Sequence, residues 1–407
     1  MRFLSLALTA IIMPALLLVS CSDDDNPAGP GTPHKVKTWS GTYGGTDAEW
    51  AVSAKATPDG GYIAVGGIVA AGTNNQDFLL VKVDSDGKLV WQKTYGGALA
   101  DFGRAVTVTA DGGYIAVGST YSFGVGNSDV YFVKTDASGN VEWEKTYGGD
   151  KWETVHEVVV TASGGYAAAG WTSSFGAPGG SDGWLVVTDA VGEPLLQKQY
   201  GGGNEDALYS LAQTRDGGFI LAGETKSFGV GSSDIFLLKV DDSCDFVWRA
   251  TCGGPGFDFA TGVVETSGGY VAAGWVGSDN LPNYHGAYDA YVVKLNLDGA
   301  LLWESCYGDA GYDGCEEIVA TRDGGFVVGG HLQDMGTGGT TGYLFKINSS
   351  GDLLWQRTFG NSSEAVEGVT RARDGGFMLA GAFYTEDPID VNLYLVKTDA
   401  SGMTLDP

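Results

Sequence analysis

The chain has 407 residues and a formal net charge of −27, with 50 acidic residues against 23 lysines and arginines. This charge argues against nucleic acid and against anionic membrane surfaces as partners, because both would repel an acidic protein. The 66 glycines, 11 Trp, 19 Tyr and 17 Phe residues indicate a turn-rich, all-β structure with a large core.

The first 20 residues have the form of an export signal. A short basic start, Met1-Arg2, precedes an apolar run over residues 3–19, which is a little short for a transmembrane helix. The tetrad LVSC then ends at Cys21. It resembles a bacterial lipobox, which implies cleavage of residues 1–20 and acylation of the Cys21 thiol, as with palmitate. An ordinary signal peptide with an incidental cysteine is the alternative.

Residues 21–34 are expected to form a flexible tether behind the lipidated cysteine. Aspartates at 23–25 and three prolines among glycine and alanine cannot bury apolar surface. The acidic run resembles the surface-export signal of Bacteroidetes-type lipoproteins, and a plain solvated linker is the alternative. We therefore expect an exported outer-membrane lipoprotein, with the cell surface as its candidate location, that touches the membrane only through its lipid anchor.

Seven copies of one unit fill residues 35–407. Each copy contains an aromatic residue before glycine, with a cysteine in its place once, and successive pivots lie 52, 52, 53, 52, 55 and 52 residues apart. The pivots are Tyr43, Tyr95, Tyr147, Tyr200, Cys252, Tyr307 and Phe359. A repeat of this length is typical of propellers and solenoids.

The second copy shows four strands in about fifty residues. Ala105–Thr109 alternates and ends at a DGG hairpin signal, and Tyr114–Gly118 is the apolar strand that follows. A loop leads to residues 129–136, and an ASG turn leads to residues 141–147. We therefore predict an all-β fold, a seven-bladed β-propeller of about 52-residue, four-stranded repeats.

The two ends of the repeat region predict how the ring closes. Residues 35–45 (KVKTWSGTYGG) match the fourth strand of a copy, but no copy precedes them. The seventh copy ends after residues 393–399 (LYLVKTD) and lacks a fourth strand of its own. The N-terminal strand should therefore complete the last blade and remove an exposed edge.

The repeat resembles the SBBP-type propeller repeats of bacteria and archaea over residues 36–402. The shared pattern is GG, D-x-A, dGG-Y-x-aG, D-x-x-x-x-K-x-D-x-x-G and W-x-x-T-Y-GG. This resemblance implies the propeller fold and says little about function. The fragment VKTDASGNVEWEK is also similar to quinoprotein-like and bulb-type lectin repeats, but the lectin mannose motif QxDxNxVxY is absent.

Residues that recur in nearly every copy are expected to serve the blade itself. A tryptophan recurs on the fourth strand, with Leu196 in one copy, and a lysine recurs on the third strand, with Val187 in one copy. The tryptophans are Trp39, Trp91, Trp143, Trp248, Trp303 and Trp355. An indole ring suits a sugar platform, but six at one repeat position indicate packing between blades.

A carboxylate stands six residues after six of the pivots. The set is Glu49, Asp101, Glu153, Asp206, Asp258 and Asp313, and the seventh copy has Glu364 one place earlier. A ring of such oxygens makes calcium a candidate cofactor. The regular recurrence favours the other interpretation, that each carboxylate caps its own loop or pairs with a lysine. No other cofactor is expected.

Four cysteines follow Cys21, all of them in copies four to six. Without CxxC spacing or a histidine cluster they do not predict a zinc site. Cys306 and Cys315 flank one loop and make the most plausible disulfide in an exported protein. Cys244 and Cys252 lie along one predicted strand, too far apart to bond each other.

The copies differ at the end of the second strand. Residues that vary there are not fixed by the blade fold and are free to bind a ligand. Four bulky or polar residues fall in adjacent copies: Trp171, Glu224, Trp275 and His331. The long loop of the fifth copy adds Asn283, Tyr284 and His285. Aromatic faces beside carboxylates and amides suit a carbohydrate, with loop packing as the alternative.

No catalytic signature such as GxSxG, HExxH or a P-loop is present. We therefore expect a monomeric cell-surface binding propeller whose partner is an extracellular glycan or protein. One alternative is a carbohydrate-active enzyme resembling an endoglucanase, or a quinoprotein-like dehydrogenase. The other is a protein-interaction scaffold.

Overall fold

A computed structural model describes residues 36–45, 47–70, 72–73, 75–176, 180–333, 339–360, 364–384 and 391–404. Val36–Pro407 forms one compact unit. The predicted lipidation site, Cys21, lies outside the described residues. Within them, no helix is long and apolar enough to cross a membrane.

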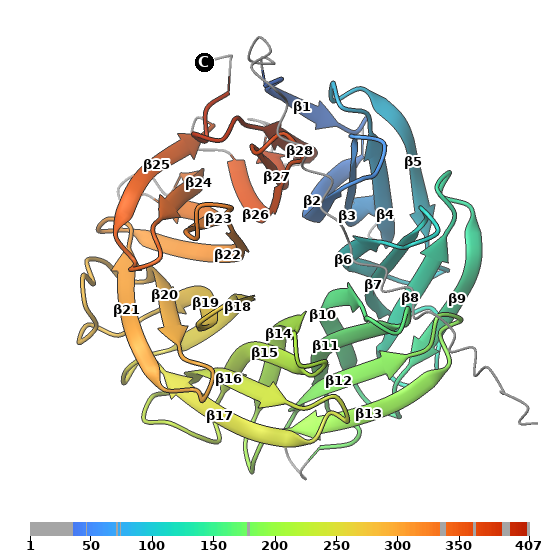
Figure 1. Ribbon diagram of the computed structural model, residues 1–407. Helices are drawn as coiled ribbons and strands as arrows, with labels where there is room; N and C mark the ends of the chain where they lie inside the picture. The colour runs from blue at the N-terminus through green and yellow to red at the C-terminus, as the bar shows by residue number, and fades with distance from the viewer. Residues whose placement is uncertain are drawn as a thin grey trace, which may run out of the picture. The chain divides into compact units, whose positions relative to one another are not determined.

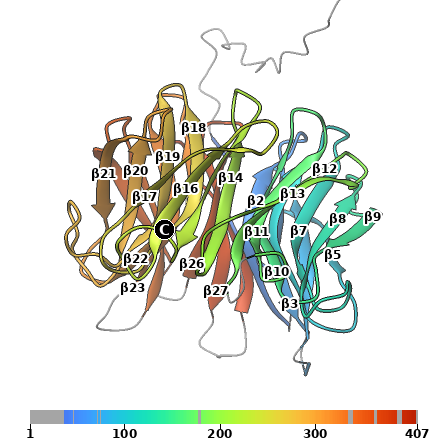
Figure 2. The same ribbon diagram turned by 90° about the horizontal axis from the view of Figure 1, so that it is seen from below.

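The described residues form seven four-stranded antiparallel sheets that surround a central axis (Figure 1). Figure 2 shows the ring from the side, with the connecting loops at its two faces. The innermost strands of blades 1 to 7 are β2, β6, β10, β14, β18, β22 and β26. Each blade continues outward in chain order, except that the outermost strand of blade 7 is β1. This arrangement confirms the predicted seven-bladed β-propeller.

The strands fall into four layers from the axis outward. The innermost layer is β2 (Ala48–Ala56), β6 (Asp101–Val108), β10 (Glu153–Val160), β14 (Asp206–Gln213), β18 (Asp258–Thr266), β22 (Tyr312–Ala320) and β26 (Glu364–Arg371). The second is β3 (Tyr62–Val69), β7 (Tyr114–Thr120), β11 (Tyr166–Thr172), β15 (Phe219–Thr225), β19 (Gly269–Val276), β23 (Phe326–Gln333) and β27 (Phe377–Tyr384). The third is β4 (Gln76–Val83), β8 (Asp129–Thr135), β12 (Asp182–Thr188), β16 (Asp234–Val240), β20 (Asp289–Leu295), β24 (Thr340–Ile347) and β28 (Val391–Lys397). The outermost is β5 (Leu89–Tyr95), β9 (Val141–Tyr147), β13 (Pro194–Tyr200), β17 (Phe246–Cys252), β21 (Leu301–Tyr307), β25 (Leu353–Phe359) and β1 (Trp39–Tyr43).

Strand β1 closes the ring as predicted. It pairs antiparallel with β28, from Trp39 opposite Lys397 to Tyr43 opposite Leu393, so the sheet order of blade 7 is β1-β28-β27-β26. The last blade is therefore built from both ends of the repeat region, and β28 is left without an open edge.

The core lies between the blades. Strands of the second and third layers are buried on both faces, which explains their continuous apolar sequence. Each of the seven hydrophobic clusters joins residues of two adjacent blades, including blades 7 and 1. Removing one blade would thus uncover two apolar faces, which ties the stability of each blade to both of its neighbours.

The recurring tryptophans pack between blades, as predicted. Each indole lies on a glycine that follows the third strand of the next blade. At Gly139, for example, an added Cβ would lie 2.9 Å from the Trp91 ring. The same glycine accepts a hydrogen bond at its carbonyl from the Tyr95 hydroxyl, at 2.8 Å. The pairs are Trp39–Gly87, Trp91–Gly139, Trp143–Gly192, Trp248–Gly299, Trp303–Gly351 and Trp355–Gly402.

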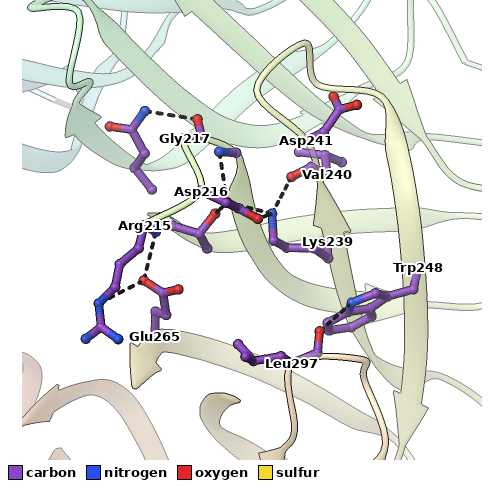
Figure 3. A network of polar contacts seen from close by, with 12 residues as sticks. Arg215, Asp216, Gly217, Lys239, Val240, Asp241, Trp248, Glu265 and Leu297 are labelled. Atoms are coloured by element: carbon purple, nitrogen blue, oxygen red, sulfur yellow. Dashed lines mark hydrogen bonds and ion pairs between the residues drawn. The ribbon is translucent and has the colours of Figure 1, made fainter. Parts of the chain in front are cut away.

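In five of the six copies the recurring lysine binds the aspartate of its own blade's hairpin turn, as Figure 3 shows for blade 4. In the remaining copy Lys294 donates to the Ser349 carbonyl of the next blade. The Lys239 ammonium donates to the Val240 carbonyl at 2.7 Å and contacts the Asp216 carboxylate of the DGG turn at 3.0 Å. The Trp248 indole in the same view donates to the Leu297 carbonyl of the next blade at 3.0 Å. These contacts assign both recurring residues to the scaffold.

In one copy Leu196 replaces the recurring tryptophan, and this replacement explains why Cys244 stands where the other copies have a glycine. In the turn of blade 4, Cys244 replaces the glycine and adopts a φ of 59°, and Leu196 replaces the tryptophan that would lie on it. The Cys244 side chain is buried in the cluster that also contacts Leu196. The Tyr200 hydroxyl still donates to the Cys244 carbonyl, at 2.7 Å. The thiol therefore fills the space that an indole occupies elsewhere.

Exchanging this pair should reveal their coupling. We expect Leu196→Trp alone to cost about 1–3 kcal/mol of unfolding free energy, because the indole would overpack against the Cys244 thiol. Adding Cys244→Gly should return the protein to nearly its original stability, because an indole would again lie on a glycine. Denaturant unfolding of the two single variants and the double variant measures the coupling. Strictly additive changes would contradict it.

The predicted disulfide between Cys306 and Cys315 is not formed. All four cysteines that the structure describes are free thiols. Cys306 lies on the outermost strand of blade 5 and Cys315 on the innermost strand of blade 6, and they belong to different core clusters. The prediction was wrong because the loop between them carries the chain from the outside of one blade to the channel side of the next.

Candidate functional site

The carboxylates that follow the pivots stand at the start of the innermost strands and serve their own loops. Asp206, for example, accepts hydrogen bonds from the Gly202 amide and the Ser227 hydroxyl, both at 2.7 Å, and from the Thr225 hydroxyl. Equivalent backbone amides bind Asp101, Glu153, Asp258 and Asp313. In the described part of the chain, no group of three or more acidic, histidine or cysteine residues is placed to hold a metal ion.

A cavity of about 560 Å³ lies between blades 3 and 4; we call it the groove. It brings together two of the predicted residues, Trp171 at the end of β11 and Glu224 on β15. Trp152 and Lys151, from the loop between β9 and β10, and Tyr209 of β14 complete its principal lining. Ser173, Ser181 and Glu205 also line it.

The groove combines aromatic faces with fixed polar groups. The Tyr209 hydroxyl donates to Glu224 Oε1 at 2.7 Å, which holds that carboxylate in one orientation. Burial, followed by the charge of Glu224, raises the pKa of Tyr209, so its hydroxyl stays protonated. Trp152 is 43% exposed and meets Tyr121 edge to face at 5.7 Å. Sequence comparison among copies missed Trp152 because it considered only the ends of the second strands.

Trp275 and His331, two other predicted residues, lie together but outside the groove. Their rings meet edge to face at 4.7 Å, and the Trp275 indole stacks on Phe259 at 5.8 Å. The indole nitrogen donates to the Cys315 carbonyl of the next blade at 2.9 Å. A Cβ at Gly314 would clash with this ring. Trp275 is therefore packed against blade 6 and only partly exposed.

The predicted residues of the long fifth-copy loop lie at a third place, near the outer strand β21. The Asn283 amide donates to the Ser305 hydroxyl at 2.9 Å, and the Tyr284 hydroxyl donates to the Ala287 carbonyl at 2.8 Å. The His285 backbone amide donates to Asp289 at 2.7 Å. Asn283 and His285 line a cavity of about 450 Å³ with residues of β21, separate from the groove.

The central channel contains a cavity lined by residues that the sequence analysis did not select. Each described innermost strand has one β-bulge, and six different residue types occupy the seven bulge positions. The seven bulge residues are Val52, Arg104, His156, Tyr209, Thr261, Glu316 and Glu367. All of them line one cavity of about 230 Å³, which we call the channel cavity. Bulges re-aim side chains and are common beside functional sites.

The sequence does mark the channel residues, by a position on the first strand that varies among the copies. Each bulge residue stands three positions after the carboxylate of its copy, from Glu49 and Val52 to Glu364 and Glu367. At this position the copies have Val, Arg, His, Tyr, Thr, Glu and Glu, whereas the carboxylate position is nearly constant. Comparing the copies along the first strand would have separated the two kinds of position.

Acidic groups dominate the channel. Glu157 and Glu317 line it beside the bulge residues Glu316 and Glu367. Lys55 Nζ contacts Glu317 Oε1 at 2.9 Å, and the Val369 amide donates to Glu317 Oε2 at 3.0 Å. This one carboxylate thus links the innermost strands of blades 1, 6 and 7.

Burial changes the protonation of several channel groups. It raises the pKa of Glu157 to about 7, against the nearby charge of Lys55. Burial and the charge of Glu367 raise the pKa of Glu316 well above its usual range. Burial and Arg104 lower the pKa of His156 to about 3, and burial lowers the pKa of His331 to about 4. Both imidazoles are therefore neutral at pH 7.

Aromatic rings form one wall of the channel across blades 3 to 6. His156 meets Tyr209 edge to face at 5.0 Å, and Tyr209 meets Phe259 at 6.2 Å. The Trp275 indole stacks on Phe259, and the His331 ring contacts the Trp275 indole edge to face. Tyr209 lines both the groove and the channel cavity, so the two cavities adjoin at this residue.

No family model matches the sequence, and no curated protein matches it. Solved structures resemble this chain at low identity. Sqt1 from Chaetomium thermophilum is 10% identical, with a TM-score of 0.47 over 85% of this chain and 95% of that one. A putative 6-phosphogluconolactonase from Bacteroides fragilis is 12% identical, with a TM-score of 0.45 over 86% and 98%. A putative gluconolactonase is 10% identical, with a TM-score of 0.40 over 89% and 92%. Likeness at this level carries no information about ligand or activity.

Proposed function

We propose that the protein is a binding propeller whose groove between blades 3 and 4 takes an extracellular glycan. The observation that carries this proposal is the meeting of Trp152, Trp171, Tyr209, Lys151 and Glu224 around one cavity. Indole faces stack on the C–H faces of sugar rings, while ammonium, carboxylate and hydroxyl groups bind sugar hydroxyls. The volume of about 560 Å³ lies within the usual range for small-ligand sites.

The proposal includes a location. Lipidation at Cys21 and a tether of residues 22–34 would hold the propeller at the outer membrane. On the cell surface the propeller would bind polymeric extracellular glycan. In this proposal the protein is a monomer and has no contact with the membrane beyond its lipid.

Trp171→Ala and Trp152→Ala should each weaken glycan binding about tenfold or more, because tenfold corresponds to about 1.4 kcal/mol of lost stacking. Their melting temperatures should change little, because both rings face the groove and are not part of the core. A glycan array with the delipidated domain identifies the sugar, and calorimetric titration with that sugar measures the loss.

Phe257→Ala is the matched control for Trp152→Ala. Phe257 stands at the same repeat position in blade 5, five residues after its pivot, and is 51% exposed, but it does not line the groove. It should bind glycan normally. Equal loss in the control, or no binding on the array, would favour a protein-interaction scaffold, and hydrolysis of a bound glycan would favour an enzyme.

A further inference from the structure

We propose that the channel cavity is a second binding site, which takes a small organic cation with an aromatic or apolar body. The cavity is distinct from the groove in its lining, apart from the shared Tyr209. Its volume of about 230 Å³ is below the usual range of about 300–1,000 Å³ for small-ligand sites, so the ligand must be small.

The charges in the channel favour a cation. Four glutamates, at 157, 316, 317 and 367, face two cationic side chains, Lys55 and Arg104, and both nearby imidazoles are neutral. Lys55 already forms an ion pair with Glu317. Burial raises the pKa of Glu157 to about 7 and that of Glu316 well above its usual range, so not all four glutamates are ionised at pH 7 without a ligand. Full ionisation would give four negative and two positive charges, a sum of −2. A bound cation would offset this excess, which is costly in a partly desolvated cavity.

Glu316 and Glu367 are the carboxylates placed to bind that cation. They occupy the bulge positions of the neighbouring blades 6 and 7. The charge of Glu367 raises the pKa of Glu316, and the charge of Arg104 opposes the rise that burial causes in the pKa of Glu367. Glu316 Oε1 lies 3.7 Å from His331 Nδ1, a neutral group that does not compensate its charge. The equivalent bulge positions of blades 1 to 5 have Val, Arg, His, Tyr and Thr, so the blade fold does not require a carboxylate there.

The aromatic wall provides the other half of the site. Tyr209 and Phe259 line the cavity, and Trp275 stacks behind Phe259. Aromatic faces attract ammonium and quaternary ammonium groups, most strongly where water is excluded. His156 Nε2 is buried with no hydrogen-bond partner among the described residues, so a polar group of the ligand could satisfy it. The ligand would therefore lie between Tyr209 and Phe259 on one side and the two glutamates on the other.

Three small probes of similar shape test the charge preference on the full chain. Phenethylammonium is the cation, phenylacetate the anion, and 2-phenylethanol the neutral compound. We expect phenethylammonium to raise the melting temperature in a concentration-dependent way and to give a measurable dissociation constant by calorimetry. Phenylacetate should give neither effect. A stronger effect of phenylacetate, equal effects of all three probes, or no effect of phenethylammonium at millimolar concentration would overturn the proposal.

Isosteric variants locate the site. Glu316→Gln and Glu367→Gln together should weaken phenethylammonium binding about tenfold or more, because they remove both charges and keep the side-chain shape. Replacing a carboxylate of raised pKa by an amide should not unfold the protein, and Phe259→Leu offers a second variant that tests the aromatic wall. Unchanged affinity in the charge variants would contradict the assignment.

Trp171→Ala separates this site from the proposed glycan groove. It should leave phenethylammonium affinity unchanged, whereas the Glu316 and Glu367 variants should leave glycan affinity unchanged. If Trp171→Ala abolishes binding of the amine, the amine lies in the groove and the channel proposal is wrong. If glycan binding fails while amine binding follows the predicted pattern, only the function proposed for the groove is lost.

Discussion

Deletion of residues 36–45 should reduce the unfolding free energy by about 5 kcal/mol, the largest loss expected from any change of this size. The deletion removes β1 and with it the outer strand of blade 7. It also removes Trp39, whose ring meets Tyr62 of blade 1 at 6.1 Å and whose indole donates to the Ser85 carbonyl at 3.1 Å. Strand β1 thus both completes blade 7 and fastens it to blade 1.

Denaturant unfolding and calorimetric melting measure this loss. A domain that begins at Val36 is the matched control, because it lacks only residues that precede the compact unit, and it should melt like the longer chain. The deletion variant should also self-associate, because β28 would present an unpaired edge. If it melts like the control, β1 contributes nothing to closure and the sheet order of blade 7 is wrong.

Replacing Lys55 with methionine should cost about 3–5 kcal/mol, because it leaves the carboxylate of Glu317 in the channel without its cation. The pair is mostly buried, with side-chain exposures of 23% and 17%. Glu157 also depends on Lys55, which opposes the rise of its pKa to about 7. The double variant Lys55→Met with Glu317→Gln should recover much of the loss, because an amide can still accept the Val369 hydrogen bond.

The loss caused by Lys55→Met should depend on pH. Burial raises the pKa of Glu157 to about 7, so the contribution of this group to stability is full below its unfolded pKa near 4.5 and is lost as pH rises through about 7. Removing the ammonium raises the pKa of Glu157 further and steepens this fall. Denaturant unfolding at pH 5 and pH 8 should therefore show the larger loss at pH 8. A loss that is equal at both values, or larger at pH 5, would show that Lys55 does not stabilise these carboxylates.

The fold could be predicted because the same four-strand sequence pattern occurs in seven copies. A tryptophan or a lysine that recurs at one position is explained by the scaffold, and the extra fourth-type strand at the start indicated how the ring closes. The disulfide prediction failed for a related reason. Proximity in sequence suggested that Cys306 and Cys315 meet, but in this fold each passage between copies crosses a blade from outside to inside.

The candidate site was predicted only in part, for physical reasons that particular residues make clear. Trp171 and Trp275 occupy the same repeat position, yet one lines the groove and the other packs on the next blade. Trp275 can pack on blade 6 because Gly314, about forty residues later in the sequence, has no side chain and leaves room for the indole ring. The channel residues were missed because a bulge changes the direction of one side chain, and strict alternation along a strand does not reveal it.

The pairing of β1 with β28 also determines the order in which a growing chain can finish folding. The first strand of the propeller to leave the ribosome pairs with the last, so blade 7 stays incomplete until residues 391–397 have been made. Until then the nascent chain holds an unmatched strand at its beginning. A chain that stops early keeps this strand available, and a released fragment containing β28 offers its complement. Two incomplete chains can therefore complete one another, which makes strand exchange between molecules the characteristic error of this architecture.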